Sequence, residues 1–219
     1  MKRLLKFVHD NGLLLIFIVL FLACLIGQAI TGSLAFNHSR AAHGLQRIGY
    51  WRYAGTGNFL QGMFANWQAA ILQLGSLIVF SVFLRARGAA HSIDPDKRPR
   101  ARQIAKHSKR TRFGRQASWA YRNSLSLAFA VLFVVTFALH LYSGTIAYNE
   151  HRALTHQPPV SVVAFSVSSK FWFTTLQTWE AEYMAIAVYI FLTIFLRQEG
   201  SPESKRVDAR DSDTGKTNE

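Results

Sequence analysis

Long stretches without charged side chains restrict the fold of this chain more than any other feature. Residues 11–39, 53–84 and 123–149 contain no Lys, Arg, Asp or Glu, and a further apolar block covers residues 183–196. A helix crosses the hydrocarbon layer of a bilayer with roughly 20 apolar residues. A water-soluble enzyme is therefore excluded. The sequence predicts four membrane-spanning helices, at residues 12–36, 67–84, 125–148 and 180–196.

The distribution of Lys and Arg between these stretches predicts how the chain is oriented. Twenty of the 25 lie in the N-terminus, in residues 85–122 or in the tail from Arg197, and only five lie in the two long loops. Lys and Arg concentrate in cytoplasmic segments. We therefore expect both termini and the central loop in the cytoplasm and the long loops outside. Most of the formal net charge of +13 then reflects topology rather than nucleic-acid binding.

The sequence also aligns with itself at an offset of 112 residues without a gap. Residues 11–88 align with residues 123–200, and 20 of these 78 positions are identical. Polar identities, such as Arg40 with Arg152, indicate duplication rather than shared apolar composition. Because each repeat contains two spans, both repeats enter the membrane from the same side. The first span also resembles a cleavable secretory signal, but the repeat favours its retention.

We therefore expect an all-α fold, namely an integral membrane four-helix bundle of two tandem parallel repeats. The long external loops can carry interfacial helices. Residues 170–197 contain no Pro or Gly and predict one helix capped by Ser168 or Ser169. A cap at Gly57-Asn58 predicts an equivalent helix over residues 59–84, whereas residues 44–57 predict turns.

The same features divide the chain into four predicted segments. Their boundaries follow the repeat alignment, the basic central loop and the polar C-terminal composition. The segments are the first two-span repeat (1–92), a basic cytoplasmic linker (93–122), the second two-span repeat (123–200) and a disordered cytoplasmic tail (201–219).

The second repeat contains a set of distinctive polar and aromatic motifs. These are Tyr148-Asn149-Glu150 followed by Arg152, Pro158-Pro159-Val160-Ser161, Phe171-Trp172, Trp179-Glu180-Ala181-Glu182 and the run from Phe195 to Lys205. With them, the chain resembles a family of small bacterial membrane proteins of unknown function over nearly residues 1–206. The resemblance implies a bacterial inner-membrane location and supplies no activity, cofactor or catalytic residue. The first repeat departs from it, with Gln68 and Ala70 in place of the two glutamates.

Polar residues near the outer boundary predict an external network. Glu180 lies 17 residues before Arg197, so it should reach the same boundary as the turn that contains Arg152. Half-buried carboxylates need compensating charges there. The alternatives for this network are a structural latch between the repeats and an ion-entry site. Its predicted members are Asn37, Arg40, Asn149, Glu150, Arg152, Glu180 and Glu182.

Two polar side chains, Gln28 and His140, occupy equivalent positions inside the first span of each repeat. They can form interhelical hydrogen bonds or line a path through the membrane. Four external histidines could instead hold a metal ion, but the duplication did not preserve them. We therefore expect no metal and no cofactor. These histidines are His38, His43, His151 and His156.

The central loop and the tryptophans predict contacts with the membrane surface. Basic residues beside a membrane helix bind anionic headgroups with about 1 kcal/mol per charge. Trp67, Trp172 and Trp179 are expected to anchor the helices at the interface. No nucleic-acid-binding motif accompanies the basic cluster. Its members are Lys97, Arg98, Arg100, Arg102, Lys106, Lys109, Arg110, Arg112 and Arg115.

These observations favour a non-enzymatic function. The sequence contains no phosphate-binding loop, nucleophile elbow or zinc-protease motif. A structural, interaction or membrane-accessory role is expected, with lipids, a second copy or another membrane protein as partners. The alternative is a channel or transporter with a polar path between repeats or subunits.

Overall fold

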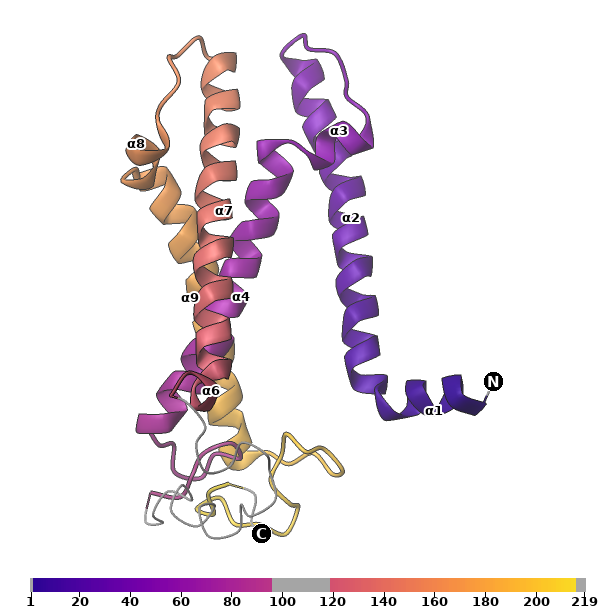
Figure 1. Cartoon of the computed structure of the whole chain (residues 1–219), viewed down its shortest axis with the longest axis vertical. Coiled ribbons are helices and arrows are strands. Elements are labelled where there is room, and N and C mark those ends of the chain that lie inside the picture. The colour runs from indigo at the N-terminus through magenta and orange to yellow at the C-terminus, as the bar shows by residue number, and fades with distance from the viewer. Residues whose placement is uncertain (1, 96–118, 216–219) are drawn as a thin grey trace. The chain divides into compact units, whose positions relative to one another are not determined.

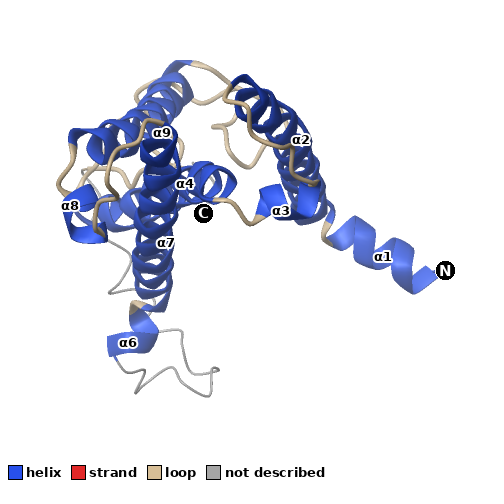
Figure 2. Ribbon diagram, turned by 90° about the horizontal axis from the view of Figure 1, so that it is seen from above, coloured by secondary structure: helices blue, strands red, loops and turns tan. Residues whose placement is uncertain are grey.

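The computed structural model describes residues 2–95 and 119–215, and within these ranges it contains helices and no strand (Figure 2). Four helices are long and apolar enough to cross a membrane. They are α2 (Gly12–Ala42), α4 (Gly57–Phe83), α7 (Ser124–Leu154) and α9 (Ser169–Phe195), labelled in Figure 1. The all-α class is confirmed within these ranges, and the four long apolar helices suggest a multi-pass membrane protein.

Short helices flank or connect the long ones. They are α1 (Lys2–Asp10), α3 (Tyr50–Ala54), α6 (Trp119–Arg122) and α8 (Val162–Ser166). The prediction that residues 44–57 form only turns is wrong, because α3 lies within them. Tyr53 in α3 is buried, with its ring centroid 5.4 Å from that of Phe36. Burial of this aromatic side chain favours a helical turn that the nearby glycines do not predict.

Three pairs of helices share the sequence offset. α7, α8 and α9 each begin and end 112 residues after α2, α3 and α4 respectively. Corresponding residues also precede α4 and α9. Ser168 Oγ accepts a hydrogen bond from the N–H of Phe171 at 3.2 Å, and Thr56 Oγ1 accepts one from the N–H of Phe59 at 3.4 Å. The Ser168 cap is as predicted. α4 begins two residues earlier than expected, because Thr56 supplies the oxygen expected from Asn58.

The chain divides into two compact units that do not follow the repeat boundaries. Unit 1 contains Met1–Met63 and His140–Ser166, and unit 2 contains Phe64–Leu139 and Val167–Glu219. α4 and α7 therefore contribute residues to both units. The segment boundaries at residues 93, 123 and 201 stay predictions.

Polar side chains join α4 to α9 within unit 2. Trp179 Nε1 donates to Gln68 Oε1 at 2.9 Å, and Gln73 Nε2 donates to the carbonyl of Glu182 at 2.8 Å. Hydrogen bonds of this kind connect membrane helices, where apolar contact with lipid offers no preference for one neighbour over another. They fix the register of α4 against α9.

The C-terminal segment forms turns around a buried lysine as far as Gly215, which differs from the disorder that its composition predicts. Lys205 is 2% exposed, and its ammonium donates to the carbonyls of Arg210, Asp211 and Asp213 at 3.1–3.2 Å. Burial lowers the pKa of this ammonium. Main-chain carbonyls satisfy the charge, and composition gives no indication of them.

Candidate functional site

The loops that follow α2 and α7 are tethered by equivalent asparagines. Asn37 Nδ2 donates to the carbonyl of Ile48 at 2.8 Å, and the N–H of Ile48 donates back to Asn37 Oδ1 at 2.8 Å. Asn149 makes the same pair of hydrogen bonds with Val160, at 2.9 and 2.8 Å. Each amide thus satisfies both main-chain groups of a loop residue eleven positions away.

Equivalent arginines tether the same loops. Arg40 Nε donates to the carbonyl of Gln46 at 2.8 Å, and its guanidinium lies 5.9 Å from the ring centroid of Phe36. Arg152 Nε donates to the carbonyl of Pro158 at 2.6 Å, and its guanidinium lies 5.7 Å from the ring centroid of Tyr148. These contacts differ from the predicted network, in which carboxylates bind the arginines. Glu180 and Glu182 belong to unit 2, and their pairing with the arginines stays a prediction.

Unit 1 contains a cavity of about 490 Å³ beside the end of α2. α2 and the loop after it form one side, α3 and the start of α4 form another, and the last turns of α7 complete it. This volume lies within the range of about 300–1,000 Å³ that is typical of small-molecule sites. The lining residues are Gly32, Ala35, Phe36, Ser39, Arg40, Leu45, Ile48, Arg52, Tyr53, Thr56, Asn58, Ala147, Glu150, His151 and Leu154.

An aromatic wall supports this cavity. Tyr53 packs against Phe36 and Phe59, and its hydroxyl donates to Asn58 Oδ1 at 3.2 Å. A Cβ on Gly32 would collide with the Tyr53 hydroxyl, so α2 and α3 approach this closely because residue 32 is glycine. Burial raises the pKa of the Tyr53 hydroxyl above its ordinary value.

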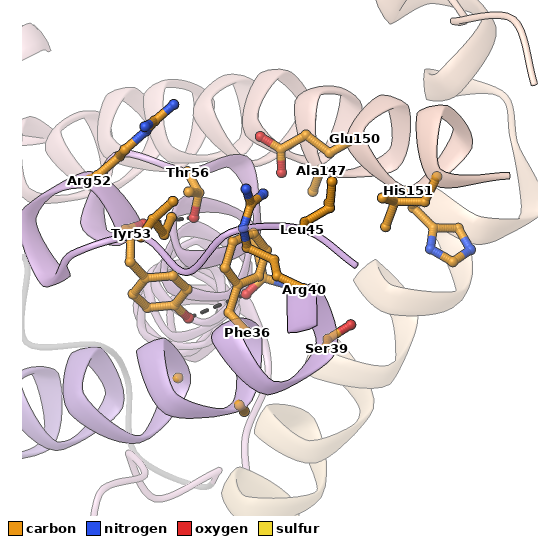
Figure 3. Close-up of a pocket in the computed structure, with 15 residues that line it drawn as sticks. Phe36, Ser39, Arg40, Leu45, Arg52, Tyr53, Thr56, Ala147, Glu150 and His151 are labelled. Atoms are coloured by element: carbon orange, nitrogen blue, oxygen red, sulfur yellow. Dashed lines mark hydrogen bonds between the residues drawn. The ribbon is translucent and has the colours of Figure 1, made fainter. Parts of the chain in front are cut away.

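Two charged groups of the cavity, Arg40 and Glu150, lie near each other without forming an ion pair. The carboxylate of Glu150 lies near the N–H of Gly57, at the N-terminus of α4, and within electrostatic range of Arg40. Figure 3 shows the Arg40 guanidinium turned toward this carboxylate, with Thr56 nearby. Among the described residues, the ion pairs do not include Arg40 with Glu150. The cavity therefore presents a cation and an anion that do not neutralise each other by direct contact.

Sequence reasoning missed most of the polar lining. From the sequence, Arg52 contributes only to the count of external charges, and Tyr53, Thr56 and Asn58 are expected in turns or at a helix cap. The alignment at offset 112 contains one signal for Tyr53, because Phe165 occupies the equivalent position and packs on Tyr148 with ring centroids 5.2 Å apart. An aromatic residue at the same place in both loops indicates a buried anchor.

The two polar residues predicted inside the first span of each repeat, Gln28 and His140, both lie in unit 1. The amide Nε2 of Gln28 lies 3.5 Å from the place that a Cβ on Gly62 of α4 would occupy. The side chain of His140 is fully buried. These positions agree with polar side chains that face protein rather than lipid. Whether they line a path stays a prediction.

The tryptophans differ from one another in their surroundings. Trp172 is 40% exposed, as a residue at a lipid interface would be. Trp67 packs edge-to-face on Phe64 at 5.7 Å. Trp179 instead lies in an aromatic cluster with Phe133, Phe137 and Trp172, besides its hydrogen bond to Gln68. Its contacts place it in the packing of unit 2, beyond what an interfacial anchor requires.

The nine basic residues predicted to contact headgroups, from Lys97 to Arg115, lie outside the described residues. Within residues 2–95 and 119–215, no group of three or more His, Cys, Asp or Glu side chains is placed to hold a metal ion. His151 lines the cavity, and His43 Nδ1 lies 2.8 Å from the carbonyl of Ser39.

A family model described as "Domain of unknown function (DUF6766)" matches residues 4–216. No curated protein and no solved structure matches the chain.

Proposed function

The chain belongs to the family of the domain of unknown function DUF6766, and on that premise we propose that it is a small bacterial inner-membrane protein with a non-enzymatic role. That role is structural, interactive or accessory to other membrane components. The exposed surface of α2 carries this proposal: of its 31 residues only Ser33 is buried within the chain. Leu13 and Phe17 are 71% and 63% exposed. Lipid tails or another membrane-embedded protein must cover a surface of this kind.

We propose further that the chain is a tandem duplication of two parallel repeats. The shared offset of the three helix pairs supports this, as do the equivalent hydrogen bonds of Asn37 and Asn149 and of Arg40 and Arg152. The charge distribution favours cytoplasmic termini and external tethered loops. In this arrangement the basic central loop meets the anionic headgroups of the cytoplasmic leaflet.

The partners in this proposal are membrane lipids together with a second copy or another membrane protein. Native mass measurement of the full chain in nanodiscs tests it by reporting stoichiometry and bound components. The single Cys24, exposed on α2, supplies a direct test of self-association in the membrane. Oxidative crosslinking should give a dimer in the native protein and none in Cys24→Ala. A monomer that retains neither lipid nor protein contradicts the proposal.

A channel or transporter is the second candidate, because the cavity of unit 1 combines charged and polar side chains at the ends of apolar helices. Reconstitution of the purified chain into liposomes discriminates between the two functions. Specific flux that Glu150→Gln abolishes favours transport. Equal leakage from liposomes with and without protein favours the interaction role.

A further inference from the structure

We propose that the unit 1 cavity binds a small zwitterionic group, with an anionic phosphate or carboxylate against Arg40 and an ammonium against Glu150. The ligand is either the headgroup of a lipid or a soluble zwitterion of the same chemistry. This site goes beyond the interaction role proposed above and is separate from the basic central loop. The zwitterion site and the interaction role can each be disproved without the other.

Arg40 is positioned to bind an anion. Its Nε is occupied by the carbonyl of Gln46 and its guanidinium lies over the Phe36 ring, which fixes the orientation of the side chain. Figure 3 shows the guanidinium end of Arg40 turned toward Glu150 across the cavity. A planar guanidinium held in this way can form two parallel hydrogen bonds with a phosphate or carboxylate. Ser39 and Thr56 add hydroxyl groups to the same lining.

Glu150 supplies the opposite charge. It lies in the last turns of α7, with its carboxylate near the N–H of Gly57, and it is not among the ion-pair partners of Arg40 in the described residues. A carboxylate accepts several hydrogen bonds, so a neighbouring N–H from Gly57 leaves acceptor capacity for a primary ammonium. A lone anion would meet repulsion from Glu150, and a lone cation would meet repulsion from Arg40. A zwitterion compensates both charges.

The apolar residues of the lining explain why the ligand can be part of an amphiphile. Phe36, Leu45, Ile48 and Leu154 share the cavity with the charged pair. The cavity also lies at the C-terminal ends of two helices that are apolar enough to span a membrane. A headgroup could bind between the charges while its chains stay among the apolar helices.

The alignment of the repeats supplies a matched control. Arg152 makes the same Nε hydrogen bond and ring contact as Arg40, but it does not line the cavity. Arg152→Gln therefore removes an equivalent loop tether and leaves the cavity charges in place. Glu150→Gln keeps an oxygen that can accept from Gly57, so it removes the charge with little effect on packing.

Calorimetric titration of the full, detergent-purified chain with O-phosphoethanolamine, inorganic phosphate and ethanolamine tests the proposal. We expect O-phosphoethanolamine to bind about tenfold or more tightly than either fragment. Arg40→Gln should weaken its binding about tenfold, and Arg152→Gln should leave it unchanged. Glu150→Gln should remove the preference over inorganic phosphate. Equal binding of all three probes overturns the proposal, as does an equal effect of Arg40→Gln and Arg152→Gln.

Nanodiscs of defined composition identify the source of the ligand. If it is a lipid, native mass spectra should show phosphatidylethanolamine retained in preference to phosphatidylglycerol, and Glu150→Gln should remove this preference. If it is a solute, the two lipids should be retained equally while O-phosphoethanolamine still binds. Absence of both preferences overturns the proposal even if the Cys24 crosslink shows self-association.

Discussion

Individual glycines set how closely the helices of unit 1 approach. A Cβ on Gly57 would collide with the backbone nitrogen of Ala147 and lie 2.8 Å from Ile146 Cγ2. The obstruction is largely backbone, which cannot rotate away as a flexible side chain can. The start of α4 therefore packs directly on α7, and this contact brings Gly57 to Glu150.

Gly57→Ala should destabilise the chain by about 1–3 kcal/mol, because the added methyl group forces α4 and α7 apart. The midpoint of thermal unfolding in detergent measures this change. Gly62→Ala in the same helix is the control: its Cβ would meet Gln28 Nε2 at an ordinary 3.5 Å, and alanine favours helix. Equal midpoints for the two variants contradict the close approach.

The asparagine tethers give a second prediction at this scale. Asn37→Ala leaves both main-chain groups of Ile48 without their partner, and each lost hydrogen bond costs about 0.5–1.5 kcal/mol. Limited proteolysis should then cut the loop after α2 faster than in the native chain. Asn149→Ala should do the same to the loop after α7. Exposed Asn66 supplies the control, and faster cleavage in Asn66→Ala would count against a specific tether.

Sequence patterns predict the long elements well and their connections poorly. Long apolar stretches and the absence of charge reveal α2, α4, α7 and α9, because those features belong to the residues themselves. The repeated asparagines and arginines also stand out, but their partners are main-chain atoms, which carry no residue identity. The sequence therefore predicts carboxylate partners and gives no indication of these main-chain partners.

The cavity could not be predicted for a related reason. It combines the end of α2, the start of α4 and the end of α7, and their approach depends on packing at Gly32 and Gly57. Glycines give no apolar signal. Only the equivalence of Tyr53 with Phe165 indicates in the sequence that these loops contain a buried anchor.

At the scale of one element, the start of α9 depends on its cap. Ser168→Ala should cost about 1 kcal/mol, because the N–H of Phe171 loses its hydrogen-bond partner. Ser169→Ala is the matched control, since Ser169 is already the first helical residue. The midpoints of thermal unfolding in detergent compare the two variants. A midpoint for Ser169→Ala as low as that for Ser168→Ala would contradict the assignment of the cap.

For the whole molecule, the distribution of charge predicts a topology that reporter fusions can check. Fusions at residues 50, 105, 160 and 219 should read outside, inside, outside and inside, because the basic segments stay in the cytoplasm. When the basic residues of the central loop are replaced with glutamine, a fraction of the chains should insert in the opposite orientation, so that the reporters give mixed signals. An external signal at residue 105 in the native chain overturns the predicted orientation.

The composition of the compact units has a consequence for biogenesis. Unit 1 joins Met1–Met63 to His140–Ser166. The helices of its first segment therefore cannot complete their contacts when they leave the ribosome. Chains emerge at about 5–20 residues per second, which leaves the start of α4 without its α7 neighbour for several seconds. During that interval Gly57 and its surroundings lack their final cover. The first half of this protein is therefore an intermediate of insertion that waits for the second, and membrane chaperones would meet it in that form.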